Sequence, residues 1–330
     1  MSDLVEIRDL HISYETARGI VYALDGVDLT VYPSQILGIV GESGSGKSTL
    51  GMAIGRLLPS NSHRTSGDLF VNGQSIFDIG DEEIRLLRQE SLGFVFQNPI
   101  STLDPTMRVG RQIRLVLNGP ASDDSVYELL GRVGLPDVKR VARSYPYQLS
   151  GGMAQRVVIA MAISRHPSLL IADEPTASLD ASVREQILKL LLSVREETGV
   201  AIVLLSHELG LVAKYCDTIA VMYGGRLVET GSNVSVFRRP GHPYTKALLE
   251  AAPGNERPGD WLEAIPGVPP VLQSSAQGCV FEPRCKFAHE TCRTVRPVLR
   301  PIENRMVACH RAEEVLKIEP TAAATHGRIA

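Results

Sequence analysis

The chain has 330 residues, of which 44% are hydrophobic and 22% are charged, a composition typical of a folded globular protein. Its length suggests one large domain, or one domain with an appendage. The formal net charge of -3 argues against a protein whose main partner is nucleic acid, because such domains are usually strongly basic.

Any attachment to a membrane is expected to be peripheral. No apolar run approaches the roughly 18–20 residues that a membrane-spanning helix needs. The longest such runs, at 36–40 and 201–205, have the length of buried strands. The opening MSDLVEIRDL lacks the basic and apolar regions of a secretory signal, so none is expected here.

The first part of the chain predicts strands and then a glycine-rich loop. Residues 5–12 and 21–32 alternate between apolar and polar side chains, which indicates an antiparallel sheet. Residues 36–40 form a continuous apolar run, as expected of a parallel strand buried on both faces. After the loop, a helix is expected from residue 47 to about residue 58.

Two hairpins are predicted by their turn residues. Asn72-Gly73 follows a strand at 68–71, and Asn-Gly is a strong hairpin signal. Gly224-Gly225 lies between the strand-like segments 218–223 and 226–230.

The middle of the chain alternates between helix and strand. Residues from about 100 to 165 have helical periodicity and predict a helical subdomain, whereas 169–172 and 201–205 are apolar strands. Between these strands, one face of an amphipathic helix is formed by Val183, Ile187, Leu190, Leu191 and Val194. This order predicts an α/β core with a parallel sheet.

The residue composition changes after about Arg239, where prolines become frequent and the periodicity of apolar residues weakens. We therefore predict a main domain at 1–240 and a small cysteine-rich C-terminal region at 241–330. The last dozen residues are expected to form a disordered tail.

The sequence GESGSGKS at 41–48 fits the phosphate-binding loop pattern in full, between a predicted strand and a predicted helix. Glycines let backbone N–H groups converge on phosphate oxygens, and the helix N-terminus favours an anion. Lys47 is expected to neutralise the β- and γ-phosphates of ATP, and the Ser48 hydroxyl to bind Mg²⁺. The expected nucleotide ligands are Gly41, Ser43, Gly44, Gly46, Lys47, Ser48 and Thr49.

An acidic pair ends the strand at 169–172. A carboxylate in this position holds Mg²⁺ in nucleotide hydrolases, which assigns Asp173 to the metal and Glu174 to the general base that polarises water. Alone, such a pair could simply cap the next helix. Beside a complete phosphate loop, the catalytic interpretation is favoured.

The sequence LSGGM at 149–153 resembles the signature motif of ABC ATPases. The resemblance covers roughly residues 4–240 and implies an ABC-type P-loop NTPase: a RecA-like core with a mixed sheet, an antiparallel β subdomain and a helical signature subdomain. In that family, the residues matching Ser150, Gly151 and Gly152 contact the γ-phosphate held by the opposite subunit of a head-to-tail dimer. Many signatures carry Gln where Met153 stands, but methionine is usual in the peptide-importer branch.

Four further residues match family landmarks in order. Tyr14 resembles the aromatic residue that stacks on adenine, and Gln97 the Q-loop residue that touches the metal and the attacking water. Asp180, in SLD, resembles the D-loop that communicates across the dimer, and His207 the switch histidine that contacts the γ-phosphate. The resemblance thus implies an ATPase coupled to transport, with Glu174, His207 and Gln97 in catalysis.

The C-terminal region resembles that of the oligopeptide, dipeptide and nickel importers. The matching strings are GHPYTKALL at 241–249, IPGV at 265–268 and GCVFEPRC at 278–285. They imply import of di- or oligopeptides, with a nickel chelate, an opine or a sugar as other cargoes. They also imply a second, homologous ATPase subunit, two membrane permeases, an extracytoplasmic binding protein and a place on the cytoplasmic face of the inner membrane. A homodimer is the alternative assembly.

Cys279, Cys285, Cys292 and Cys309 lie close together in sequence, which suits a zinc ion, an iron–sulfur cluster or reduced thiols. The tight Cys-x₂₋₄-Cys pair of structural zinc sites is absent. Because some peptide importers carry a [4Fe–4S] cluster at matching cysteines, the resemblance implies that cluster here.

Two rival functions remain in other branches of the family. A soluble ABC ATPase of DNA repair or the ribosome typically has paired cassettes, coiled-coil insertions or zinc modules, and an exporter cassette is often fused to membrane spans. Neither pattern is found in this sequence.

Overall fold

The structure is a computed structural model that describes residues 3–117, 119, 122–251 and 265–318. Its contacts divide the chain into two compact units. The first unit comprises Met1–Val31, Ile36–Asp78 and Leu205–Ala330, and the second comprises Tyr32–Gln35 and Ile79–Leu204. The tail predicted to be disordered, residues 319–330, lies outside the described residues.

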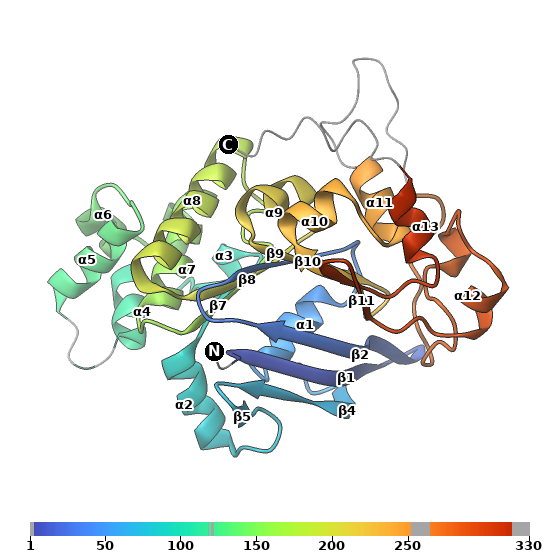
Figure 1. Cartoon of the computed structure of the whole chain (residues 1–330). Coiled ribbons are helices and arrows are strands. Elements are labelled where there is room, and N and C mark those ends of the chain that lie inside the picture. Colours follow the sequence, from blue (N-terminus) through green and yellow to red (C-terminus); the bar gives the residue numbers. More distant parts are fainter. Residues whose placement is uncertain (1–2, 118, 120–121, 252–264, 319–330) are drawn as a thin grey trace. The chain divides into compact units, whose positions relative to one another are not determined.

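The first unit contains an antiparallel sheet with the strand order β2-β1-β4-β5. Its strands are β1 (Val5–Thr16), β2 (Gly19–Val31), β4 (Ser62–Val71) and β5 (Gln74–Ser75), drawn in blue in Figure 1. The predicted Asn72-Gly73 hairpin is confirmed: Val71 pairs with Gln74, and both turn residues have the positive φ that such a turn requires.

A second sheet gives the first unit five strands in the order β11-β12-β10-β9-β3. They are β11 (Arg300–Ile302), β12 (Arg305–Val307), β10 (Arg226–Ser232), β9 (Thr218–Tyr223) and β3 (Ile36–Val40). β3 and β9 run parallel whereas β9 and β10 are antiparallel, so the sheet is mixed, as predicted. β3 is fully buried, which explains its unbroken apolar sequence.

The helices of the first unit are short. They are α1 (Lys47–Ile54), α9 (Leu209–Tyr215), α10 (Asn233–Arg238), α11 (Pro243–Glu250), α12 (Glu290–Thr294) and α13 (Ala312–Lys317). α1 ends earlier than predicted because Gly55 caps it and Arg56 has a positive φ, which interrupts the helical backbone.

The last part of the chain is built onto the second sheet. β12 pairs with β10, with Glu229 opposite Val307, and β11 then pairs with β12. A small core forms behind these strands from Ile302, Val307, Ala312 and Leu316, with Cys309 packed against it.

The second unit combines parallel strands with helices. Its sheet has the order β8-β7-β6, formed by β6 (Leu92–Val95), β7 (Leu169–Asp173) and β8 (Ala201–Ser206), of which residues up to Leu204 belong to this unit. Its helices are α2 (Asp81–Ser91), α3 (Pro99–Thr102), α4 (Val109–Val116), α5 (Asp123–Arg132), α6 (Val138–Arg143), α7 (Gly151–Ile163) and α8 (Ala181–Thr198). On α8, the predicted apolar face is buried from Ile187 to Val194, while Val183 is partly exposed.

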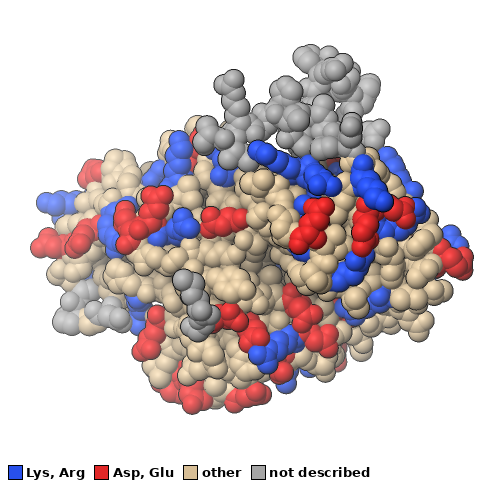
Figure 2. Space-filling view, viewed as in Figure 1, with Lys and Arg blue, Asp and Glu red and all other residues tan. Residues whose placement is uncertain are grey.

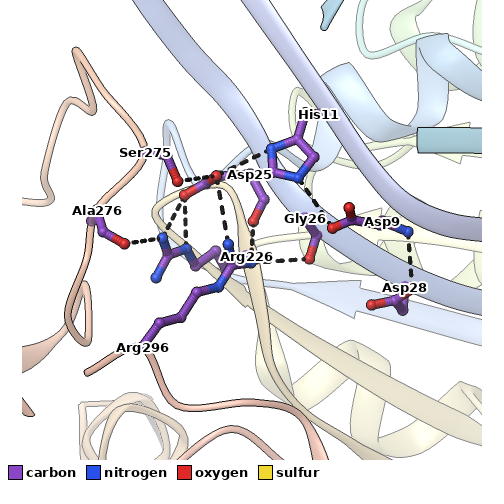
Figure 3. Close-up of polar contacts among 9 residues, drawn as sticks. All are labelled: Asp9, His11, Asp25, Gly26, Asp28, Arg226, Ser275, Ala276 and Arg296. Atoms are coloured by element: carbon purple, nitrogen blue, oxygen red, sulfur yellow. Dashed lines mark hydrogen bonds and ion pairs between the residues drawn. The ribbon is translucent and has the colours of Figure 1, made fainter. Parts of the chain in front are cut away.

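Within the first unit, a buried carboxylate, Asp25 on β2, connects the antiparallel sheet to the C-terminal segment (Figure 3). Arg226 donates two hydrogen bonds to Asp25 Oδ2, and its remaining N–H groups reach the carbonyl oxygens of Ala276 and Gly278. Ser275 donates to Asp25 Oδ1, and Arg296 donates to the carbonyl oxygen of Asp25. Three segments that are distant in sequence therefore meet at one carboxylate.

The surface carries both signs of charge. In the view of Figure 2, acidic and basic side chains are interspersed, in keeping with 34 Lys and Arg residues against 37 Asp and Glu residues in the sequence. None of the helices in the described ranges has the length and apolar character needed to cross a membrane.

Candidate nucleotide-binding and catalytic site

The phosphate loop lies in the first unit, between β3 and α1. The close packing of its first residue requires glycine: a Cβ on Gly41 would lie 2.2 Å from the carbonyl oxygen of Met222 on β9. Gly46 takes the N-cap position of α1 in the left-handed conformation, and no acidic residue lies in the first turn of that helix. A helix N-terminus with no acidic residue in its first turn suits an anion.

Lys47 is nearly buried and turns into the loop. Its Nζ donates to the carbonyl oxygens of Gly41, at 2.7 Å, and Glu42, at 3.0 Å. Ser43, Gly44 and Ser48 are exposed on the loop. A cation held beside exposed hydroxyl groups and a helix N-terminus is chemically suited to a polyphosphate and its Mg²⁺.

Tyr14 is brought to the same region from β1. Its hydroxyl lies 3.1 Å from the Thr49 hydroxyl on α1, two residues after Lys47. The structure therefore brings together the aromatic residue and the phosphate loop that the sequence predicted separately. His207, immediately after β8, is exposed and also belongs to the first unit.

The predicted catalytic residues of the second unit meet at one edge of its sheet. β6 and β7 are parallel neighbours, with Val95 opposite Ala172, so the residues after them lie side by side. Gln97 Nε2 donates to Glu174 Oε2 at 3.1 Å. Asp173 ends β7, and Glu174 follows with a φ of 45°, a conformation that costs energy for a non-glycine residue.

The signature segment begins α7 in the second unit. Ser150 is the N-cap residue, and its hydroxyl accepts the N–H of Met153 at 3.3 Å. Gly152 allows a close approach to α8, because a Cβ there would lie 2.6 Å from Val183 Cγ1.

Asp180 is the N-cap residue of α8. Its carboxylate accepts the N–H groups of Val183 and Ser182, and these hydrogen bonds, the one from Val183 first, lower its pKa. The side chain of Leu179, beside it, reaches toward Gly151 of the signature. The predicted signature and D-loop segments are therefore packed together.

The predicted iron–sulfur cluster at Cys279, Cys285, Cys292 and Cys309 is wrong. Within the described ranges, no group of three or more His, Cys, Asp and Glu side chains is arranged to hold a metal ion. The four cysteines do line one cavity, but its volume is about 10 Å³, which is the room that a single water needs. The sequence spacing placed the cysteines near each other without fixing where their sulfur atoms point.

The cysteines instead fit reduced thiols. Burial raises the pKa of Cys285 to about 11 and that of Cys309 to about 12, and it also raises the pKa of Cys279. Cys292 Sγ lies 3.0 Å from His289 Nδ1. Protonated thiols are poor nucleophiles.

Three functional candidates escaped the sequence analysis: Glu42 in the phosphate loop, and Tyr244 and Arg284 in the C-terminal region. Tyr244 and Arg284 lie in the strings GHPYTKALL and GCVFEPRC, which did carry a signal. These strings indicated a family, but they did not predict that both side chains contact Glu42.

Comparison with known proteins gives two family matches. Residues 24–177 match the family "ABC transporter", and residues 228–292 match "Oligopeptide/dipeptide transporter, C-terminal region".

Full-length relatives agree with these matches. The oligopeptide transport ATP-binding protein OppD of Salmonella typhimurium is 41% identical over 95% of this chain and 95% of its own length. OppD of Escherichia coli is 40% identical over 95% of this chain and 94% of its own. A probable peptide ABC transporter ATP-binding protein of Sinorhizobium fredii is 39% identical over 96% of this chain and 97% of its own length.

Two solved structures of similar fold also match this chain. A dimeric post-hydrolysis state of the ATP-binding cassette MJ0796, bound to ADP and Pi, has a TM-score of 0.62 and 30% identity, covering 69% of this chain and 98% of its own. The structure of cbiO1 from Clostridium perfringens has a TM-score of 0.62 and 29% identity, and the match covers 72% of this chain and 91% of that one.

Proposed function

The chain belongs to the family of ATP-binding proteins of oligopeptide and dipeptide ABC transporters, and from this we propose that it hydrolyses ATP to drive import of di- and oligopeptides. The observation that carries the cargo class is the match of the C-terminal region at 228–292, because the ATPase motifs themselves are common to ABC proteins of every cargo.

The first unit supplies the residues that hold ATP. Lys47 neutralises the β- and γ-phosphates, the backbone of the loop binds their oxygens, and Tyr14 stacks on the adenine. Ser48 is the Mg²⁺ ligand from this unit. The position of Lys47 inside the loop and the contact of Tyr14 with Thr49 support these roles. Bound Mg²⁺ would offset negative charge on the phosphates.

The second unit supplies the residues that act on water and metal. Asp173 would hold Mg²⁺, and Gln97 orients the attacking water. Glu174 accepts the proton of that water as its oxygen bonds to the γ-phosphorus and the bond from the γ-phosphorus to the bridging oxygen of ADP breaks, so that ADP and phosphate are released. The hydrogen bond between Gln97 and Glu174, together with the strained backbone of Glu174, supports this assignment. His207 is proposed to contact the γ-phosphate.

We propose that the chain acts in a dimer with a second, homologous ATPase subunit. Ser150, Gly151 and Gly152 then contact the nucleotide held by the partner, and Asp180 carries the signal between subunits. A dimeric relative, MJ0796, supports this assembly. Two membrane permeases and an extracytoplasmic binding protein complete the transporter, with this chain on the cytoplasmic face of the inner membrane.

We also propose a division into an ATPase domain at 1–240, with its helical part near 100–165, and a cysteine-rich C-terminal region at 241–330. Helices α4–α7 support the helical part. The pairing of β12 with β10 implies that the two divisions fold as neighbours that share a sheet.

Uptake of labelled peptides in a strain that lacks this gene tests the proposal. The strain is complemented with the wild type, with Glu174→Gln or with the matched control Glu196→Gln, which removes an exposed carboxylate from α8. Wild type and Glu196→Gln are expected to restore uptake, whereas Glu174→Gln should bind ATP but lower its hydrolysis by at least about a hundredfold.

Two outcomes would contradict parts of the proposal. Normal hydrolysis by Glu174→Gln would remove Glu174 from the role of general base. Unchanged peptide uptake in the deletion strain, with loss of uptake of a nickel chelate, an opine or a sugar, would change the cargo but keep the ATPase.

A further inference from the structure

Glu42, the second residue of the phosphate loop, is held on two sides by the C-terminal region. Its main-chain N–H donates to the Tyr244 hydroxyl at 2.8 Å. Its carboxylate accepts two parallel hydrogen bonds from Arg284: Nη1 to Oε2 at 2.6 Å and Nη2 to Oε1 at 3.0 Å. Such a two-pronged pair fixes direction as well as distance.

Arg284 is itself locked in place. Its side chain is only 5% exposed, and Nε donates to the carbonyl oxygen of Pro266 at 2.7 Å. Nη2 also reaches the carbonyl oxygen of Ile265, and Nη1 the Tyr223 hydroxyl at 3.1 Å. The guanidinium therefore has little freedom to follow Glu42 if the loop moves, and it acts as a fixed anchor.

Tyr244 is equally rigid. The residue is fully buried, its ring centroid lies 4.5 Å from that of Tyr223, and its N–H donates to His242 Nδ1 at 3.0 Å. The N–H groups of Gly241 and His242 in turn bond to the Glu229 carboxylate on β10. The hydroxyl that meets the loop is thus fastened to the second sheet.

Glu42 also contacts Lys47, the lysine of the phosphate-binding loop. Lys47 Nζ donates to the carbonyl oxygen of Glu42, so a shift of this residue changes the surroundings of the ammonium group. Loss of Arg284 would also leave an unpaired carboxylate in a loop that receives a highly charged anion. Because like charges repel, an unpaired carboxylate in this loop would oppose binding of the anion.

We propose that Arg284 and Tyr244 are positioning residues for the phosphate loop, and that through Glu42 they set its affinity for ATP. The C-terminal region is then a working part of the nucleotide site. The inference rests on the proposed function only in that the loop binds ATP.

The test measures ATP binding and steady-state hydrolysis by the full chain. Arg284→Met is expected to weaken ATP binding about tenfold and to raise KM with kcat within about twofold, because it leaves Glu42 unpaired in the loop. Tyr244→Phe, which removes only the hydroxyl, should weaken binding about threefold. The matched control is Arg293→Met, which removes an arginine of the same region that pairs with Glu282 at 2.9 Å and should bind ATP normally.

A double variant separates electrostatics from simple loss of structure. Adding Glu42→Gln to Arg284→Met removes the unpaired carboxylate and is expected to recover most of the lost affinity. If the double variant binds ATP as weakly as the single one, the electrostatic part of the proposal is wrong. If Arg284→Met does not fold, Arg284→Lys keeps the charge with one donor group and should give an intermediate affinity.

Folded Arg284→Met and Tyr244→Phe proteins with wild-type ATP affinity would overturn the inference. A wild-type chain that binds ATP but never hydrolyses it, with any partner, would instead contradict the proposed function, so the two failures are distinguishable.

Discussion

Arg226 and Asp25 form a buried ion pair in which two N–H groups of one guanidinium, Nε and Nη2, donate to a single carboxylate oxygen at 2.9 and 2.6 Å. The Asp25 side chain is fully buried and that of Arg226 is 7% exposed. The pair joins β2 to β10, and its further hydrogen bonds reach Ser275, Ala276 and Gly278. The C-terminal region is therefore fastened at this carboxylate as well as at Glu42.

Replacing Asp25 should destabilise the chain strongly. Asp25→Asn is expected to lower the free energy of unfolding by about 3 kcal/mol or more, because it leaves the charge of Arg226 buried without a counter-charge. Denaturant-induced unfolding measures the change. Glu82→Gln, which breaks an exposed ion pair with Arg85 on α2, is the matched control and should leave stability unaltered. Equal effects of the two substitutions would contradict the role of the buried pair.

Stability should fall on mild acidification because of His242. Burial lowers the pKa of His242 to about 3, far below the value of about 6.5 in an unfolded chain. Below about pH 6.5, His242 is therefore protonated in the unfolded chain but stays neutral in the folded chain, so folding becomes less favourable. Between pH 7 and pH 5 this group alone should remove about 2 kcal/mol of stability.

The variant His242→Asn tests this pH dependence. Its side-chain oxygen keeps an acceptor for the N–H of Tyr244 but takes up no proton. The free energy of unfolding of both proteins is measured at pH 5, 6 and 7. Below the pKa of an unfolded histidine, its dependence on pH should be weaker for the variant, by the slope that corresponds to uptake of about one proton on unfolding. Glu229, whose pKa is raised by burial, is present in both proteins and so does not affect the comparison. Parallel profiles would show that His242 takes up a proton in the folded chain.

Ser150 is expected to have a role beyond that of a helix cap. Ser150→Asn keeps a side-chain oxygen for the N–H of Met153, so its stability should stay within about 1 kcal/mol of the wild type. ATP hydrolysis should nevertheless fall at least about tenfold if the hydroxyl contacts the partner's nucleotide. The matched control is Ser122→Asn, at the N-cap of α5, which should keep full activity. Full hydrolysis by Ser150→Asn would reduce Ser150 to a capping residue.

The sequence by itself determined the elements whose signals are local. A few consecutive residues were enough to predict the phosphate loop, the apolar strands β3, β7 and β8, and the two glycine-containing turns. In these elements the backbone conformation, or burial on both faces, directly restricts which residue types can occur. The order of these motifs was enough to assign the family, which the comparisons confirm. The family resemblance also implied that Gln97 and Glu174 both act in catalysis, and in the structure their side chains are hydrogen-bonded to each other.

Only the tertiary structure decided how the C-terminal region meets the ATPase. Arg284 and Glu42 are 242 residues apart, and Arg226 and Asp25 are 201 residues apart, so no periodicity or spacing connects them. The cysteines gave the opposite lesson: their proximity in sequence predicted a metal cluster that their side-chain arrangement does not support. Local sequence fixes backbone conformation, whereas charge pairs and ligand geometry depend on where distant segments pack, and that is set by the fold as a whole.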